Sequence, residues 1–223
     1  MPELNIMKQL RYFLTLAAIA IASFIMAGPA AAQQEAPDAF IKRISQDVLD
    51  TAKADKEIQS GNQKRVLEVV QSKILPHVDF QRMTSLAAGR FWREANPEQQ
   101  KQLIKEFSSL LVYTYSGAIT QIRDQKLEFK PLRADPSDTE VEVRSQVVQP
   151  RGEPIQLNYR LEKTPNGWKI YDLNVLGAWL VETYKGNFAA EISKGGIDGL
   201  IKALSEKNKR LAASATKGAK TAS

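Results

Sequence analysis

Apolar residues recur at intervals of three and four along residues 96–122, and this spacing predicts a long amphipathic helix. Asn96 is expected to cap the helix, with Pro97 in its first turn and Gln99 as the capping-box partner. The apolar stripe is wide, so other elements are expected to pack around it. Its positions are Leu103, Ile104, Phe107, Leu110, Leu111, Thr114, Tyr115, Ala118, Ile119 and Ile122.

The same spacing predicts three shorter helices before residue 96. The first begins at Pro37 and ends before a polar break at residues 53–60. Asn62 and Asp79 are suited to cap the second and the third. Gly89 falls inside the third helix, where it costs up to about 1 kcal/mol relative to Ala. All of these helices are amphipathic and need an apolar surface to cover.

After Ile122 the period of the pattern changes to two, which predicts β-strands. Each strand has one apolar and one polar face, and residues 151–153 and 165–167 have the composition of hairpin turns. A four-stranded antiparallel sheet with one apolar face needs a helical cover, so the predicted fold class is α+β, with amphipathic helices packed on one face of the sheet. The strands are expected at residues 127–132, 141–147, 155–161 and 168–175.

The C-terminal part of the chain predicts two more helices. In the first, Leu180, Tyr184, Phe188 and Ile192 recur every four residues, and Gly195-Gly196 is suited to end it. The second covers residues 197–204. Residues 212–223 are small, polar and basic, and we expect this tail to be disordered.

Residues 1–32 have the pattern of a secretory signal peptide. Lys8 and Arg11 precede an apolar run from Tyr12 to Ala27, and Ala30 and Ala32 are small residues suited to a cleavage site. The alternative is a retained membrane anchor, but the run is shorter than the roughly 18 residues that a membrane-spanning helix needs. We therefore expect export to the periplasm and a single mature domain over residues 33–211.

The composition excludes several kinds of chemistry. The chain of 223 residues contains no Cys and one His, His77, so thiolate catalysis, disulfides and a convincing zinc site are excluded. The formal charge of +6 would suit an anionic partner, but acidic residues are interspersed, and export argues against nucleic acid.

Asp172 is the residue that most suggests an enzyme. A period of two places it on the same strand face as Trp168 and Ile170, and a carboxylate in an apolar cavity could act as a general base. The alternative function is therefore a small-molecule isomerase or hydrolase. We favour a structural carboxylate bonded to backbone amides or to an Arg, because the sequence offers no second catalytic group.

Three stretches resemble the periplasmic lipid-shuttle family of the Mla system, which is also known as the Ttg2-type toluene-tolerance auxiliary family. The first is ILPHVDFQRMTSLAAGRFWREANPEQQKQLIKEF, at residues 74–107. The second is GWKIYDLNVLGAWLVETYKGNF, at residues 167–188, and the third is GGIDGLIKAL, at residues 195–204. The resemblance covers nearly all of the mature chain, and its specificity comes from the order and spacing of the motifs.

The resemblance implies that the helices and a curved four-stranded sheet enclose an apolar pocket for phospholipid acyl chains. It implies a carrier rather than an enzyme, with no cofactor, no metal and phospholipid as cargo. The implied partners are an outer-membrane lipoprotein–porin complex and an inner-membrane ABC transporter with a substrate-binding-domain ring. The residues that we expect to line the pocket are Phe107, Leu110, Leu111, Tyr115, Val141, Val143, Val147, Leu157, Tyr159, Ile170 and Val175.

Overall fold

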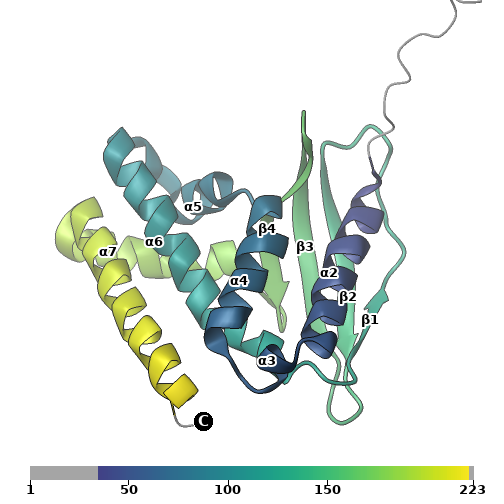
Figure 1. The fold of residues 1–223 in the computed structure, drawn as a ribbon. Helices are drawn as coiled ribbons and strands as arrows, with labels where there is room; N and C mark the ends of the chain where they lie inside the picture. The colour runs from purple at the N-terminus through teal and green to yellow at the C-terminus, as the bar shows by residue number, and fades with distance from the viewer. Residues whose placement is uncertain (1–34, 221–223) are drawn as a thin grey trace, which may run out of the picture. The chain divides into compact units, whose positions relative to one another are not determined.

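Helices cover one face of a twisted antiparallel sheet in this computed structural model, which describes residues 35–220 and the side chains of residues 35–214 (Figure 1). The predicted signal peptide lies outside the described residues. No helix among those described is both long and apolar enough to cross a bilayer. The fold class is α+β, as predicted.

The sheet has five strands in the order β1-β2-β3-β4-β5, each antiparallel to its neighbour, where the sequence predicted four. The additional strand is only two residues long. It forms because a tight turn after β4 folds the chain back against that strand. The strands are β1 (Lys126–Phe129), β2 (Glu140–Val148), β3 (Ile155–Thr164), β4 (Gly167–Val175) and β5 (Ala178–Trp179).

Six α-helices and three 3₁₀ turns lie within the described residues. The helices are α2 (Pro37–Ala54), α3 (Lys56–Gln59), α4 (Gln63–Lys73), α5 (Phe80–Ala88), α6 (Pro97–Tyr115) and α7 (Leu180–Lys220). The 3₁₀ turns are η1 (Leu75–His77), η2 (Gly89–Arg93) and η3 (Ser116–Gln121).

The predicted helix starts are confirmed. The side chains of Asn62, Asp79 and Asn96 each accept a hydrogen bond from a backbone N–H in the first turn of the helix that follows. Asn96 and Gln99 form the complete capping box. Each cap satisfies a backbone donor that has no partner inside its helix.

Three helix boundaries differ from the prediction. Gly89 does not lie inside α5 but ends it, because its φ of +57° turns the chain out of the helix. The predicted break at residues 53–60 contains the short helix α3, which Asp55 caps with two hydrogen bonds. The helix predicted over residues 96–122 tightens into the 3₁₀ turn η3 after Tyr115.

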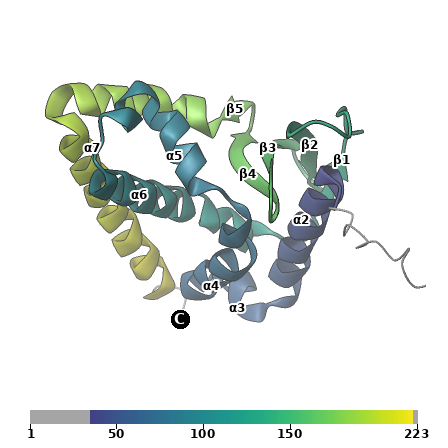
Figure 2. The ribbon, with the colours of Figure 1, turned by 90° about the horizontal axis from the view of Figure 1, so that it is seen from above.

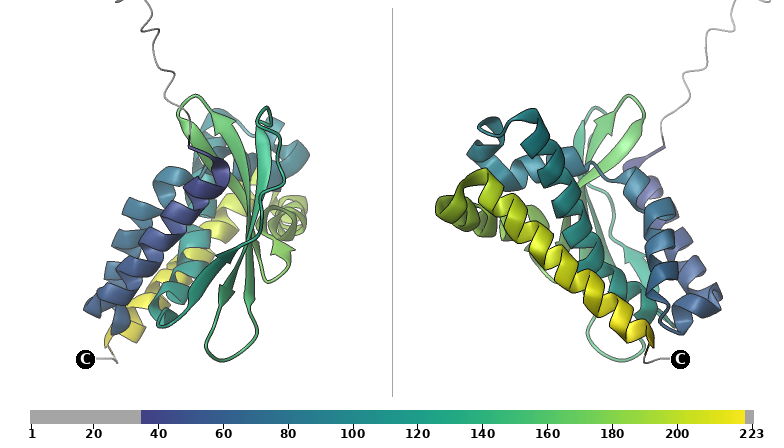
Figure 3. Two further views of the ribbon diagram at one scale, coloured as in Figure 1. Left: turned by 90° about the vertical axis from the view of Figure 1, so that its right-hand side faces the viewer. Right: turned by 60° about the vertical axis from the view of Figure 1, so that its left-hand side comes forward.

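Helix α7 consists of two arms that meet at a kink at Gly195 and Gly196, where the backbone is not helical. The second arm lies alongside α6 (Figure 3), and the Asn208 side chain donates hydrogen bonds to the backbone and the side chain of Glu106. The arm continues to Lys220, so the predicted disorder of residues 212–223 is wrong for residues 212–220. Ala and Lys, which are frequent there, have high helix propensity.

A β-bulge in β4 changes which face its residues occupy. Ile170 pairs with Leu161, but Asp172 pairs with Arg160, so Tyr171 is an extra residue in the ladder. Ile170 and Asp172 therefore lie on opposite faces of the sheet, contrary to the strict alternation expected from the sequence. Beyond the bulge, it is Leu173 that faces the same side as Tyr159.

The buried apolar residues form three separate clusters. The first joins α5, α6 and α7 around Phe107, the second joins α2 to the sheet around Leu161, and the third joins α2, α3, α4 and η3 around Val66. Seen from above, α2 and the group formed by α5, α6 and α7 lie on opposite sides of the fold (Figure 2). Side chains from all three clusters face a shared space between them.

Candidate binding cavity

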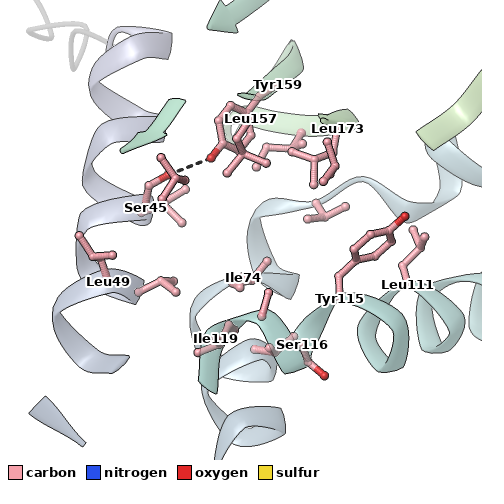
Figure 4. Close-up of a pocket in the computed structure, with 18 of the residues that line it drawn as sticks. Ser45, Leu49, Ile74, Leu111, Tyr115, Ser116, Ile119, Leu157, Tyr159 and Leu173 are labelled. Carbon is pink, nitrogen blue, oxygen red and sulfur yellow. Dashed lines mark hydrogen bonds between the residues drawn. The ribbon is translucent and has the colours of Figure 1, made fainter. Parts of the chain in front are cut away.

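That space is a cavity of about 580 Å³ bounded by α2, α4, α5, α6, the 3₁₀ turns η1 and η3, and the inner face of the sheet (Figure 4). The volume lies within the range of roughly 300–1,000 Å³ that is typical of ligand sites. The walls are almost entirely apolar. The helical side is lined chiefly by Ile41, Ile44, Val48, Leu49, Val70, Ile74, Leu75, Phe80, Met83, Leu111, Val112, Tyr115 and Ile119, and the sheet side by Leu127, Val147, Ile155, Leu157, Tyr159, Ile170, Leu173 and Val175.

The polar groups deep in this wall are paired or buried. The hydroxyls of Tyr159 on β3 and Ser45 on α2 are 3.3 Å apart and share a hydrogen bond (Figure 4). Burial raises the pKa of the Tyr159 phenol, so the group stays neutral. The Ser116 hydroxyl accepts a hydrogen bond from Gln63. A ligand in contact with this part of the wall would meet carbon atoms and no charge.

The cavity has a mouth at one end of the sheet. The exposed lining residues Ala118 and Gln121 lie there, together with the half-buried Gln125 and Gln149. At the other end the lining residues, such as Met83, are buried. Apolar walls that end at exposed polar residues suit an elongated apolar ligand with a polar end group.

The turn between β4 and β5 stands at the mouth end of the sheet and holds an unusual leucine. Leu176 follows the wall residue Val175, has a φ of +54°, and leaves 72% of its surface exposed. Gly177 also has a positive φ, +89°, so the pair forms a two-residue turn of the type I′ kind. The left-handed conformation costs a residue such as leucine roughly 1–2 kcal/mol.

Leu176→Asn is therefore expected to stabilise the protein. Asn-Gly is the preferred pair for this turn, and the exposed leucine side chain buries little surface that could be lost. The free energy of unfolding should rise by roughly 1 kcal/mol. Urea denaturation followed by circular dichroism would measure the change, with Leu86→Asn on α5 as the control at a second exposed leucine. An unchanged or lower free energy of unfolding would contradict the expected strain.

Seven of the eleven residues predicted to line the pocket lie on the cavity wall: Leu111, Tyr115, Val147, Leu157, Tyr159, Ile170 and Val175. The other four lie in packed core. Phe107 and Leu110 belong to the cluster with α7, whereas Val141 and Val143 belong to the cluster under α2. A role in ligand binding stays a prediction for the seven. The other four were expected on the cavity wall, but the structure places them in packed core.

The prediction missed most of the helical wall. Five residues of α2 line the cavity. The sequence predicted that this helix is amphipathic, but not what its apolar face meets. Leu173 was missed because the bulge at Tyr171 reverses the alternation after Ile170. No local signal in the sequence marks that bulge.

Asp172 does not line the cavity, which corrects the placement that the alternative enzyme function required. Its carboxylate lies on the opposite side of the sheet and accepts hydrogen bonds from the N–H groups of Leu173 and Val181 and from the Arg160 guanidinium. Burial raises the pKa of this carboxyl, and the hydrogen bonds counter the shift. The residue holds the start of α7 against the sheet.

His77, the one histidine in the sequence, packs against an aromatic ring. The His77 ring packs edge-on against Phe40, with the ring centroids 5.4 Å apart. Burial lowers the pKa of His77, with the cations of Arg43 and Lys169 adding to the effect. Within residues 35–214, no group of three acidic, His or Cys side chains is placed to hold a metal ion.

Comparison with known proteins identifies the family to which this fold and cavity belong. A family model described as MlaC protein matches residues 42–206. The chain belongs to the MlaC family. The match begins in α2 and ends in the second arm of α7, so it includes part or all of every element that lines the cavity.

Two of the proteins that this chain resembles carry phospholipid in their names. The intermembrane phospholipid transport system binding protein MlaC of Haemophilus influenzae is 22% identical over 86% of this chain and 91% of its own length. The toluene tolerance protein ttg2D of Pseudomonas putida is 23% identical over 74% of this chain and 76% of its own. A solved phospholipid-binding protein from Ralstonia solanacearum, in complex with a phospholipid, is 50% identical, with a TM-score of 0.75 over 78% of this chain and 98% of that one.

Proposed function

We propose that this protein is a non-enzymatic phospholipid carrier whose cavity holds the acyl chains of its cargo. The observation that carries the proposal is the apolar cavity of about 580 Å³ with a polar mouth at one end. The Ralstonia relative, which is 50% identical, is a phospholipid-binding protein solved with a phospholipid. The placement of Asp172 outside the cavity removes the only residue that favoured an enzyme.

The energetics of carriage follow from the chemistry of the walls. Exposing acyl chains to water costs about 0.8 kcal/mol per methylene, or roughly 24 kcal/mol for a lipid with about thirty methylenes. A carrier must hide most of this surface and still release the lipid to a bilayer or a partner. Carbon walls without charge meet both needs, because they bind acyl chains without directional contacts. They should also accept a range of headgroups.

We further propose that the carrier works in the periplasm. There it would pass lipid between an outer-membrane lipoprotein–porin complex and an inner-membrane ABC transporter with a substrate-binding-domain ring. The name of the Haemophilus relative, a binding protein of an intermembrane phospholipid transport system, supports a place in a lipid transport system. The signal-peptide pattern of residues 1–32 supports export.

Native mass spectrometry tests the proposal directly. Protein purified without detergent should carry mass additions that match phospholipids, and the delipidated protein should regain them from vesicles. Circular dichroism before and after delipidation serves as the control for folding. Repeated preparations of folded protein with no bound lipid and no uptake would overturn the proposal.

A further inference from the structure

A second, smaller hollow lies on the outside of the cavity wall, between α4 and α6. It has a volume of about 130 Å³ and is lined by Leu67, Gln71, Leu75, Ser108, Ser109, Val112 and Tyr113. Leu75 and Val112 also line the main cavity. At this point the wall between the cavity and the outer cleft is therefore one side chain thick.

Leu75 and Val112 form the partition between the cavity and the cleft, and they differ in conformational freedom. Val112 lies inside α6, where a β-branched side chain keeps one preferred rotamer. Leu75 lies in the three-residue turn η1, directly after the end of α4, and its side chain is only half-buried. Both residues pack at the edge of the third cluster and are not among its buried members. Leu75 is therefore the less constrained of the two side chains.

Within the residues that the structure describes, apolar packing alone joins the helices on either side of the cleft. Among the described residues, no hydrogen bond or ion pair joins α4 to α6; the nearest polar link runs from Gln63 to Ser116 in η3. The Ser108 hydroxyl is bonded to the Lys105 carbonyl of its own helix. The two helices can therefore separate locally without breaking a polar contact.

The cleft is apolar where it adjoins the main cavity and polar elsewhere. Leu67, Leu75 and Val112 give it an apolar inner surface, and Gln71 and Ser109 give it a polar outer edge. The cleft contains no charged residue among those that line it, so it offers nothing to a phosphate group. The polar mouth of the main cavity lies elsewhere, at the end of the sheet.

We propose that this cleft is a second opening of the lipid cavity, through which an acyl chain longer than the cavity passes its methyl end. Leu75 and Val112 then set the length of chain that the closed cavity accepts. The inference rests on the proposed function, because it assigns a route to the same cargo. It adds a determinant of chain-length specificity at a site remote from the headgroup.

A photoactivatable lipid tests the route. Delipidated protein would be loaded from vesicles with phosphatidylglycerol that carries a diazirine at the terminal carbon of one acyl chain, in a short-chain and a long-chain form. After irradiation, mass spectrometry locates the adducts. The long-chain probe should label Gln71, Ser109 or Tyr113, and the short-chain probe should label residues inside the cavity, such as Ile119.

Variants of the partition should shift this pattern in opposite directions. Leu75→Ala should raise cleft labelling by the long-chain probe several-fold, and Leu75→Trp should abolish it while labelling inside the cavity persists. Leu86→Ala is the matched control, because it removes the same atoms at an exposed position on α5 that lines neither the cavity nor the cleft, and it should leave cleft labelling unchanged.

Two outcomes would overturn the inference, and they can be told apart. If the long-chain probe labels only the cavity interior in the wild type and in Leu75→Ala, the cleft is not an outlet, although lipid is bound. If neither probe forms an adduct anywhere on folded protein, the proposed function fails and this inference fails with it. The comparison of the two probes on wild-type protein remains decisive even if a variant does not fold.

Discussion

Leu157→Asp is expected to lower lipid affinity by at least about 100-fold while the protein remains folded. Leu157 lies on the inner face of β3 in the cavity wall and is only half-buried, so water in the empty cavity can solvate the new carboxylate. A bound acyl chain would remove that water, at a cost of several kcal/mol for an unpaired charge. Each 1.4 kcal/mol, roughly, is a tenfold change in affinity.

Uptake of phospholipid from vesicles, measured by native mass spectrometry, would determine the loss. Gln156→Asp is the matched control, because it places the same charge one residue away on the exposed face of the same strand. It should bind lipid as the wild type does. If folded Leu157→Asp bound lipid at full occupancy, the inner face of β3 would not be part of the lipid-binding wall.

Val143→Asp should behave differently, although the sequence predicts the same role for Val143 as for Leu157. Val143 is 2% exposed and packs in the cluster under α2, so a carboxylate there has no route to water. We expect this variant to lose folded structure and not binding alone. Circular dichroism separates the two effects.

Phe107→Ala is expected to lower the free energy of unfolding by roughly 3–5 kcal/mol. The Phe107 ring is 0% exposed, and its centroid lies 4.9 Å from those of Tyr184 and Phe188 on α7. Removing it leaves a void where α6 meets α7 and deletes two edge-to-face contacts. Chemical denaturation would measure the loss.

Phe80→Ala provides the contrast for that prediction. Phe80 lines the cavity and is half-buried, so its truncation widens an existing space instead of creating a void in packed core. We expect a smaller loss of stability than for Phe107→Ala and a larger change in the lipid that is bound. Equal losses of stability in the two variants would contradict the separation of cavity wall from core.

Features set by neighbouring residues could be predicted from the sequence. The caps at Asn62, Asp79 and Asn96 each depend on a side chain and a backbone N–H three residues away, and all three caps are present. The strands β2 and β3 follow from alternation, since both have one face against the helices. The α+β class follows from these elements.

Features set by the packing of distant elements could not be predicted. Phe107 and Leu111 belong to one stripe on α6, yet only Leu111 reaches the cavity, because the first meets the aromatic rings of α7. Which of the two faces the cavity depends on where α7 docks. Likewise, the bulge at Tyr171 moved Asp172 to the other face, and period-two reasoning cannot detect an extra residue in a ladder.

The division of the buried residues into three clusters has a consequence for the life cycle of the carrier. Without lipid, the protein must hold its three buried clusters in place around an empty cavity. Bound lipid would pack against all three clusters. Ligand that binds only the native state adds RT ln(1 + [L]/Kd) to stability, or about 2.7 kcal/mol at a concentration 100 times Kd. Proteases should therefore degrade vacant carriers faster than occupied ones, which would match the abundance of the carrier to the supply of lipid.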